Sequence, residues 1–428
     1  MHSELYHQLE RYRTSGKVRL HMPGHGGALS PFDVTELAET DDLLDPVPGG
    51  AIETDEKAAA ELFGSRATLF SAGGATLCLQ TAICERIRAL KKGARVFCTR
   101  AVHRSVLHVL ALLDVDPVFL PLTECVYESD ISAGDLFIFN GCNYYGEIPD
   151  YKALSSFCRT RGVHTVVDNA HGTHLRFLSG GVLHPLQYGF ELIVDSAHKT
   201  LSCLTGAALL HVGADLVGER DAIVAALRAS MRLFSSTSPS FLVLLSLAEE
   251  LSRLRAGFDG ENYAPFVRRA EAIERVRAAL SLPAFGRDPM RLVLVSKKLD
   301  PAFAERLASF GIVAEFAREG EAVFLFGEAF SAKEEARLIE ALRRSLDAPI
   351  SSSAPLVPAV FPVRACSLRE AFFAPSELVE KESAVGRVAA EVVGLYPPGT
   401  ALCMPGERLE QNTLDLWKGT QIRVVKEG

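Results

Sequence analysis

Residues 192–210 have the sequence LIVDSAHKTLSCLTGAALL, in which an apolar run ends at Asp195 and is soon followed by Lys199. The run lacks strict alternation of polar and apolar residues, which is typical of a strand buried on both faces. A lysine just beyond such a strand lies at the carboxyl edge of a sheet, where open α/β folds bind ligands. Burial there would favour the neutral amine, which can form a Schiff base. Taken alone, Lys199 is more simply a solvated lysine, because most lysines are exposed.

Strand-like runs alternate with helical runs around this stretch. Such alternation predicts βαβ units and a mainly parallel sheet with helices over its faces. We therefore expect an α/β fold with a seven-stranded sheet. The expected strands are 67–71, 95–99, 117–122, 136–140, 164–169, 192–196 and 207–212, with helices at 75–91, 102–114 and 150–161.

The rest of the chain predicts an arm and a second, smaller domain. A short amphipathic helix opens the chain and leads into a Gly-, Pro- and His-rich segment that should lie across another surface. Near the end, a linker is expected at 351–362 and a helix at 376–394. The expected parts are an N-terminal arm (1–55), a large domain (56–255), a small α+β domain (256–350) and a C-terminal segment that completes the small domain and the active site (351–428).

The composition favours an ordinary cytoplasmic protein. The chain has 428 residues, of which 48% are hydrophobic and 23% charged, and its net charge of −8 argues against a basic nucleic-acid-binding face. Its nine cysteines include no CxxC pair, so we expect reduced thiols and no zinc site. The N-terminus lacks an apolar core of signal-peptide type, and no apolar run could span a bilayer.

Three further features precede Lys199 along the chain. Asp168 ends an expected strand in VVDNAHGTH (166–174), and a carboxylate there could keep a pyridine nitrogen protonated. The turn SAGGAT (71–76) opens a helix whose free backbone N–H groups could hold a phosphate. His103 follows another strand and could stack on a flat cofactor. Each feature also has an ordinary explanation, as a helix cap, a strand–helix turn or a polar loop residue.

The order of these features is more informative than any one of them. All fall at the same edge of one expected sheet, and a flat phosphorylated aldehyde bound to Lys199 would explain them together. That compound is pyridoxal 5′-phosphate, whose protonated ring acts as an electron sink for a carbanion.

The motifs of the chain resemble those of the Orn/Lys/Arg decarboxylases, a branch of the pyridoxal phosphate enzymes with the aspartate-aminotransferase (type I) fold. The resemblance covers nearly the whole chain and is greatest to the short bacterial members without a wing domain. The motifs are HMPGHGG (21–27), DDLLDPVPGGAI (41–52), RAVHRSV (100–106), VVDNAHGTH (166–174), DSAHKTLSCLTGAALLH (195–211), SSTSPSFLVLLSL (235–247), VEKESAVGRVAAE (379–391) and YPPGTALCMPGE (396–407).

The resemblance assigns a role to each candidate site residue. Lys199 would bind the cofactor covalently, Asp168 would pair with its ring nitrogen, and His103 and Ala170 would pack on the two ring faces. His171 would lie near the ring oxygen, and Glu407 would bind the distal cationic group of the substrate. The phosphate would be held by Ser196, His198, Gly74, Ala75 and Thr76, with Ser236 and Thr237 reaching it from a partner subunit.

The implied activity is decarboxylation of a basic amino acid, namely lysine, ornithine or arginine, to an amine or polyamine precursor. A homodimer or higher homo-oligomer with active sites at the interface is implied as well. Two alternatives stay open: another pyridoxal phosphate reaction, such as a lyase or aminotransferase step, and a catalytically weakened homologue with a binding or regulatory role.

The sequence departs from the family pattern at several positions. Gly26 replaces a lysine after His25, and Asn169 replaces the acid of VDEAHG. In the phosphate turn, Gly73 and Ala75 replace polar residues, and Leu77 and Leu79 replace polar or small ones. All of these changes leave Lys199 and Asp168 in place.

Overall fold

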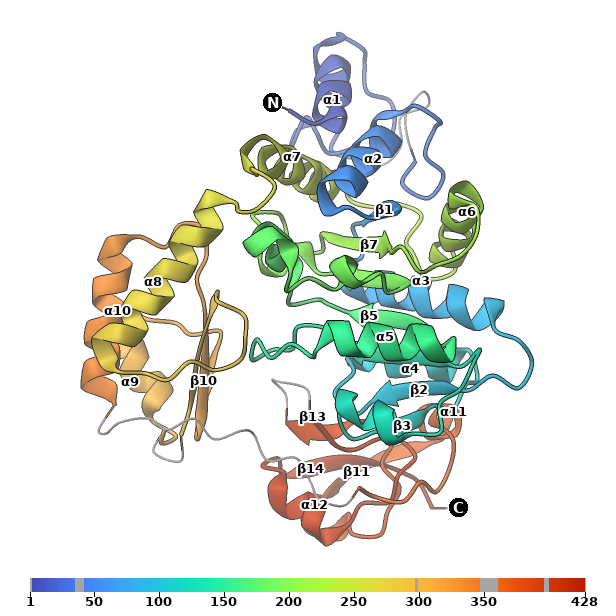
Figure 1. The fold of residues 1–428 in the computed structure, drawn as a ribbon, viewed down its shortest axis with the longest axis vertical. Coiled ribbons are helices and arrows are strands. Elements are labelled where there is room, and N and C mark those ends of the chain that lie inside the picture. The colour runs from blue at the N-terminus through green and yellow to red at the C-terminus, as the bar shows by residue number, and fades with distance from the viewer. Residues whose placement is uncertain (1, 35–41, 297–298, 347–360, 396–399, 428) are drawn as a thin grey trace.

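A computed structural model describes the chain except for residues 1, 35–41, 297–298, 347–360, 396–399 and 428. Its centre is a seven-stranded sheet with the order β1-β7-β6-β5-β4-β2-β3 (Figure 1). Only β7 runs antiparallel to its neighbours, so the predicted mainly parallel sheet is confirmed. The strands are β1 Ala67–Ser71, β2 Val96–Thr99, β3 Val118–Leu120, β4 Leu136–Asn140, β5 His164–Asp168, β6 Leu192–Asp195 and β7 Ala208–Val212.

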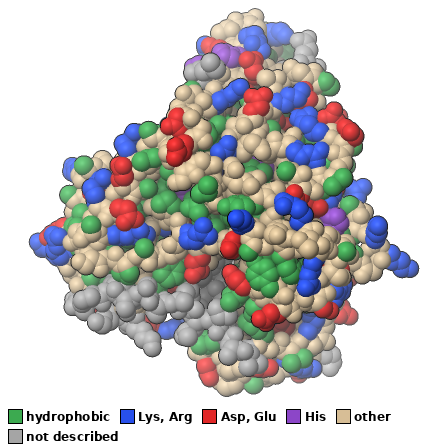
Figure 2. Space-filling model, in the orientation of Figure 1, with side chains coloured by type: hydrophobic (Ala, Val, Ile, Leu, Met, Phe, Trp, Pro, Cys, Tyr) green, Lys and Arg blue, Asp and Glu red, His purple; other side chains and the backbone are tan. Residues whose placement is uncertain are grey.

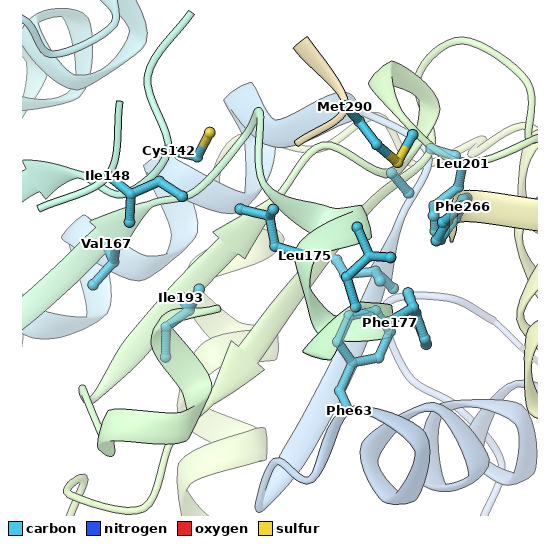
Figure 3. Close-up of a cluster of buried hydrophobic side chains, with 14 of the residues drawn as sticks. Phe63, Cys142, Ile148, Val167, Leu175, Phe177, Ile193, Leu201, Phe266 and Met290 are labelled. Carbon is cyan, nitrogen blue, oxygen red and sulfur yellow. The ribbon is translucent and has the colours of Figure 1, made fainter. Parts of the chain in front are cut away.

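Successive strand residues pack into two different hydrophobic clusters, one on each side of the sheet. On β6, Ile193 belongs to the first cluster, whereas Leu192 and Val194 belong to the second. Figure 3 shows part of the first cluster, which includes Val167 of β5, Ile193 of β6 and Phe177. The helices of this domain are α2 Ala51–Phe63, α3 Gly74–Ala89, α4 Arg104–Leu112, α5 Tyr151–Arg161, α6 Arg220–Met231 and α7 Phe241–Gly257.

The N-terminal helix α1 (Glu4–Thr14) lies against α2 and α7 at one end of the molecule (Figure 1). Asp55 on α2 accepts hydrogen bonds from the backbone N–H groups of Glu4 and Leu5, at 2.9 and 2.8 Å. Because α2 already begins at Ala51, the predicted boundary of the arm at residue 55 falls inside a helix. The Gly- and Pro-rich segment before it concealed that start, since Gly50 caps α2 without a side chain.

The small domain is a three-stranded antiparallel sheet, ordered β8-β10-β9, with helices on it. It stands beside the large domain in Figure 1. Its core is built by apolar residues of both layers, such as Phe266, Leu292 and Leu342. The elements are α8 Ala264–Leu280, β8 Arg291–Val295, α9 Phe303–Ser309, β9 Phe316–Arg318, β10 Glu321–Leu325 and α10 Ala332–Ser345.

The C-terminal segment forms a unit of its own, which we call the C-terminal unit (residues 361–427). Strand β11 (Ser376–Glu380) pairs with β14 (Gln421–Val425), and β12 (Val393–Leu395) pairs with β13 (Thr400–Cys403). The helix predicted over 376–394 is therefore wrong. Its Glu- and Ala-rich sequence has good helix propensity, but pairing of β11 with β14 overrides that weak preference. Gly386, with a φ of +80°, also breaks the segment.

The C-terminal unit packs on the large domain, whereas the sequence predicted that it would complete the small domain. Helix α11 (Leu368–Phe373) lies against α4, and Asp116 before β3 accepts a hydrogen bond from the N–H of Leu368 at 2.9 Å. Arg364 pairs with the same carboxylate at 3.4 Å. The remaining helix is α12 (Gln411–Leu416). The predicted linker at 351–362 lies almost wholly outside the described residues.

The surface is mixed in charge. Figure 2 shows basic and acidic side chains intermingled over one face of the molecule, with no broad area of a single sign. None of the helices in the described part of the chain has the length and apolar character needed to cross a membrane. Within the same residues, no group of His, Cys, Asp and Glu has the arrangement of a metal site.

Candidate active site

A cavity of about 1220 Å³ opens where the large domain, the small domain and the C-terminal unit meet. Its floor is formed by residues that follow the carboxyl ends of β2, β4, β5 and β6. This is the sheet edge where the sequence analysis placed the site. The cavity brings together ten of the predicted site residues: Gly74, Ala75, Thr76, His103, Asp168, Ala170, His171, Ser196, His198 and Lys199.

Lys199 ends a short turn, Ala197–Lys199, that follows β6. Its Nζ lies 2.9 Å from Nε2 of His171. Burial lowers the pKa of Lys199 below its ordinary value, although the negative charge of Asp168 opposes the change. The amine at the cavity wall is therefore more often neutral near pH 7 than that of a surface lysine, as a nucleophilic amine requires.

Asp168 is the last residue of β5 and only 4% exposed. One of its oxygens accepts a hydrogen bond from the backbone N–H of Ala170 at 3.2 Å. Burial raises the pKa of Asp168, against the opposing charges of His103 and Lys199. A carboxylate in this position is suited to a cationic N–H group in the cavity, because such a partner would offset its loss of solvation.

The turn before α3 gives the cavity a helix N-terminus. Gly74 has a φ of +71°, which favours glycine, and no side chain caps α3. The N–H groups in the first turn of a helix have no acceptor within it, so those of Ala75 and Thr76 are available to an anion. A Cβ at Gly73 would lie 2.8 Å from Cδ2 of Leu77. The Leu77 side chain thus takes up the space next to Gly73, and both residues are departures from the family pattern.

His103 and His198 are two of the four histidines that line the cavity. His103 caps α4, where its Nδ1 accepts a hydrogen bond from the N–H of Ser105 at 3.3 Å. Burial lowers the pKa of His103, with Asp168 opposing. Nδ1 of His198 lies 3.1 Å from the carbonyl oxygen of Ala207, which fixes the ring at the start of β7.

Asn169 turns away from the cavity into a buried polar cluster. Its Nδ2 donates to Asp195 at 2.7 Å, and its Oδ1 accepts from the N–H of Cys142 at 3.2 Å. Asp195 also contacts His184 and His211, at 3.0 and 3.3 Å. Burial alone would raise the pKa of Asp195, but the two histidines hold it well below its usual range. The amide of Asn169 can donate to this carboxylate, whereas an ionised acid at its place would repel it.

Comparison with known proteins finds family matches in two separate parts of the chain. A model of the Orn/Lys/Arg decarboxylase major domain matches residues 3–134, and a model of the C-terminal domain of the same family matches residues 358–419. The chain is therefore similar to the Orn/Lys/Arg decarboxylase family in both of these parts. The resemblance inferred from its motifs is thereby confirmed.

Relatives of this family match along nearly the full length. The arginine decarboxylase of Bacillus subtilis is 26% identical, over 99% of this chain and 95% of its own. The lysine decarboxylase of Francisella novicida has a similar fold, with a TM-score of 0.78 at 15% identity over 99% of this chain and 81% of that one. A structure of SPT with PLP matches more distantly, with a TM-score of 0.54 and 13% identity over 68% of this chain and 75% of that one. The two structural matches establish the fold.

Three of the predicted site residues do not line the cavity. Ser236 and Thr237 are exposed on the loop between α6 and α7. Glu407 is buried and forms two hydrogen bonds with Arg100, each 2.7 Å long, and its Oε2 also accepts from the N–H of Met404. The structure therefore corrects the expected place of Glu407, because its carboxylate is directed at Arg100 and not at the cavity.

The sequence analysis overlooked several residues of the site. Glu147, Glu315 and Glu391 line the cavity, one from each of three separate parts of the chain. Arg291, which lies behind His171, was also missed. Glu391 ends the quoted motif 379–391, but the sequence analysis gave it no role. Glu147, Glu315 and Arg291 belong to none of the quoted motifs, so no local signal distinguished them from ordinary surface charges.

Proposed function

We propose that the protein is a pyridoxal 5′-phosphate-dependent decarboxylase that acts on a basic amino acid: arginine, lysine or ornithine. The observation that carries this proposal is the half-buried amine of Lys199, whose pKa is lowered by desolvation, in the same cavity as the buried carboxylate of Asp168. The family supports the reaction, and the arginine decarboxylases among its relatives support the substrate class.

The residues of the cavity fit this cofactor. Asp168 would pair with the ring N–H, and the start of α3, with Ser196 and His198, would hold the phosphate. His103 and Ala170 would contact the two ring faces. When bound, pyridoxal phosphate supplies an aldehyde for amine capture and a ring that accepts the electron pair left when carbon dioxide departs.

Lys199 is also the best placed group to move the proton at Cα. Its Nζ is at the cavity wall and adjoins His171. Cys142 is a poorer donor, because the thiol is 1% exposed and burial raises its pKa far above its usual range. Nδ1 of His198 is already engaged by a backbone carbonyl. We therefore assign both amine capture and proton transfer to Lys199.

We assign recognition of the substrate's distal cation to acids of the cavity in place of Glu407. Glu315 accepts a hydrogen bond from the hydroxyl of Tyr144 at 2.5 Å, and Glu147 accepts one from Nδ2 of Asn143 at 2.7 Å. Glu391 extends from the C-terminal unit. A guanidinium or ammonium group would be attracted to these three exposed carboxylates at the cavity wall.

A substrate panel tests the proposed function. The purified protein, saturated with pyridoxal phosphate, is incubated with arginine, lysine, ornithine and the neutral control norleucine. We expect carbon dioxide and the matching amine from at least one basic amino acid and none from norleucine. Production of a keto acid without carbon dioxide would instead identify a transaminase. Failure to bind pyridoxal phosphate at micromolar concentration would favour a homologue with a binding or regulatory role.

We further propose a homodimer in which one subunit completes the other's phosphate site. Ser236 and Thr237 are exposed outside the cavity of their own subunit, and the arm exposes Val18, Leu20 and Leu29 at 80%, 91% and 85%. Two-fold dimers are the commonest assembly, and a second copy would cover such apolar side chains.

Subunit mixing tests the shared site. A Lys199→Ala subunit and a Ser236→Ala/Thr237→Ala subunit should each be weakly active alone. After mixing and reassembly, about a quarter of wild-type activity should return, because each mixed dimer keeps one intact site. Light scattering that shows a fully active monomer would contradict the dimer. Absence of complementation would contradict the shared site.

The cysteines bear on the compartment. All nine are free thiols in the structure, and most are buried. Proteins with many unpaired cysteines suit a reducing environment. We therefore propose that the protein works in the cytoplasm.

A further inference from the structure

Arg291 connects the small domain to the candidate active site. It is the first residue of β8, is 1% exposed and does not line the cavity. Its Nη2 donates to the carbonyl oxygen of His171 at 2.9 Å and lies 3.2 Å from Nδ1 of the same ring. On the other side of that ring, Nε2 lies 2.9 Å from Nζ of Lys199. The three side chains thus form a continuous polar chain.

A buried carboxylate, Asp288, holds the Arg291 side chain on the side away from His171. Nε of Arg291 donates to Asp288 at 3.1 Å, and Asp288 also contacts Nε2 of His174 at 2.8 Å. Burial would raise the pKa of Asp288, but His174 and Arg291 outweigh it and lower the pKa to about 2. The carboxylate therefore stays ionised at neutral pH and holds the guanidinium in place.

Hydrogen-bond chemistry decides where the protons of this chain lie. A guanidinium can only donate, so Nδ1 of His171 must accept from Arg291. A neutral imidazole carries a single proton, which then resides on Nε2. That N–H points at Lys199, and an amine can accept it only when it is unprotonated, since an ammonium group has no lone pair.

The electrostatics of the surroundings agree with this arrangement. Burial lowers the pKa of His171 well below its ordinary value, and the positive charge of Arg291 lowers it further, which favours the neutral ring. The ring is also held sterically, because Tyr144 meets it edge to face at 4.9 Å between centroids. The acids that face Lys199 are Asp168 and Glu315, and both favour its protonated form. A hydrogen bond that stabilises the neutral amine would therefore counteract the effect of these two acids on the pKa of Lys199.

We propose that Arg291 is a positioning residue that holds His171 in the tautomer with its proton on Nε2, so that His171 donates a hydrogen bond to a neutral Lys199 amine. Resting on the proposed function, this role keeps the amine ready to attack the aldehyde of the cofactor. No local pattern in the sequence marks Arg291, because the network joins residues 171, 199, 288 and 291 only in three dimensions.

The test measures the protonation of Lys199 directly and needs no turnover. Full-length protein, stripped of bound aldehyde, is pulse-labelled with trace acetic anhydride over a pH series, and acetylation of Lys199 is read by peptide mass spectrometry. Arg291→Lys retains the positive charge but loses the planar fork that reaches Asp288 and His171 together. We expect it to raise the labelling midpoint by about one pH unit, the equivalent of one hydrogen bond.

Two further variants make the result specific. His171→Phe leaves Arg291 and Asp288 untouched and should raise the midpoint similarly, and adding Arg291→Lys to it should produce little further shift. Arg277→Lys is the matched control: Arg277 is also buried and donates to the carbonyl oxygen of Arg291 at 3.1 Å. It should not move the midpoint.

Unchanged or lowered midpoints in Arg291→Lys and His171→Phe would overturn the proposed role, as would an equal shift in Arg277→Lys. The labelling does not depend on decarboxylation. A wild-type protein that decarboxylates while its variants keep the same midpoint would refute only the role of Arg291. Shifted midpoints in a protein that decarboxylates nothing would support that role and refute only the proposed function.

Discussion

Lys199→Ala is expected to lower kcat/KM for the basic amino acid by about 10⁴-fold or more, since one residue performs both amine capture and proton transfer. The variant should also lose the visible absorbance of covalently held pyridoxal phosphate. The fold should persist, because Lys199 lies at the cavity wall and ends a short turn rather than filling the core. Steady-state kinetics and an absorbance spectrum measure both effects.

Chemical rescue and a control lysine make this prediction specific. A small primary amine such as ethylamine should restore part of the activity of Lys199→Ala, because it can replace the missing proton carrier in the vacated space. Lys152→Ala, at an exposed site on α5, should match wild type. Retention of both full activity and the visible absorbance by Lys199→Ala would refute the proposed role.

Loss of the Arg100–Glu407 pair is expected to have the largest effect on stability. The two side chains are each 5% exposed, and Arg100 also lies 4.5 Å from the centre of the Phe361 ring. Removing one partner leaves a buried charge without its counterion, at a cost of about 3–5 kcal/mol. Arg100→Met and Glu407→Gln should therefore both lower the denaturant midpoint, and loosening of the C-terminal unit should appear as faster proteolysis there.

Two comparisons separate this structural role from substrate binding. The double variant Arg100→Met/Glu407→Met should regain much of the stability lost by Arg100→Met, because an apolar pair carries no unpaired charge. Glu391→Gln, on the cavity wall, should raise KM for the basic substrate and leave the denaturant midpoint unchanged. If Glu407→Gln instead raised KM strongly with normal stability, Glu407 would bind the substrate as the motif resemblance implied.

The sequence predicted the site best where reactive or polar residues follow the ends of predicted strands. Lys199, Asp168, His103 and the Gly74–Thr76 turn each follow a strand of a covered parallel sheet, so their convergence in one cavity follows from topology. Their roles toward a cofactor remain predictions. Glu407 was assigned from the motif resemblance and not from a strand end, and its partner Arg100 lies 307 residues away in the chain. A motif identifies the residue but not the side chain it meets.

Long-range pairing also explains the errors in the fold. The segment 376–394 has a helical composition, yet β11 pairs with β14 more than forty positions along the chain. The place of the C-terminal unit depends on contacts such as Leu368 with Asp116, which no local period encodes. Arg291 was missed for a similar reason, since a buried arginine and an exposed one have the same sequence signature.

The contact between the turn before α3 and Leu77 has a consequence for how such a site can change by mutation. A side chain introduced at Gly73 would meet Leu77 with its first carbon atom, at 2.8 Å from Cδ2 and 3.0 Å from Cβ. A side chain at position 73 therefore requires the end of the Leu77 side chain to move or to be shortened. The effect of a substitution at either position thus depends on the residue at the other.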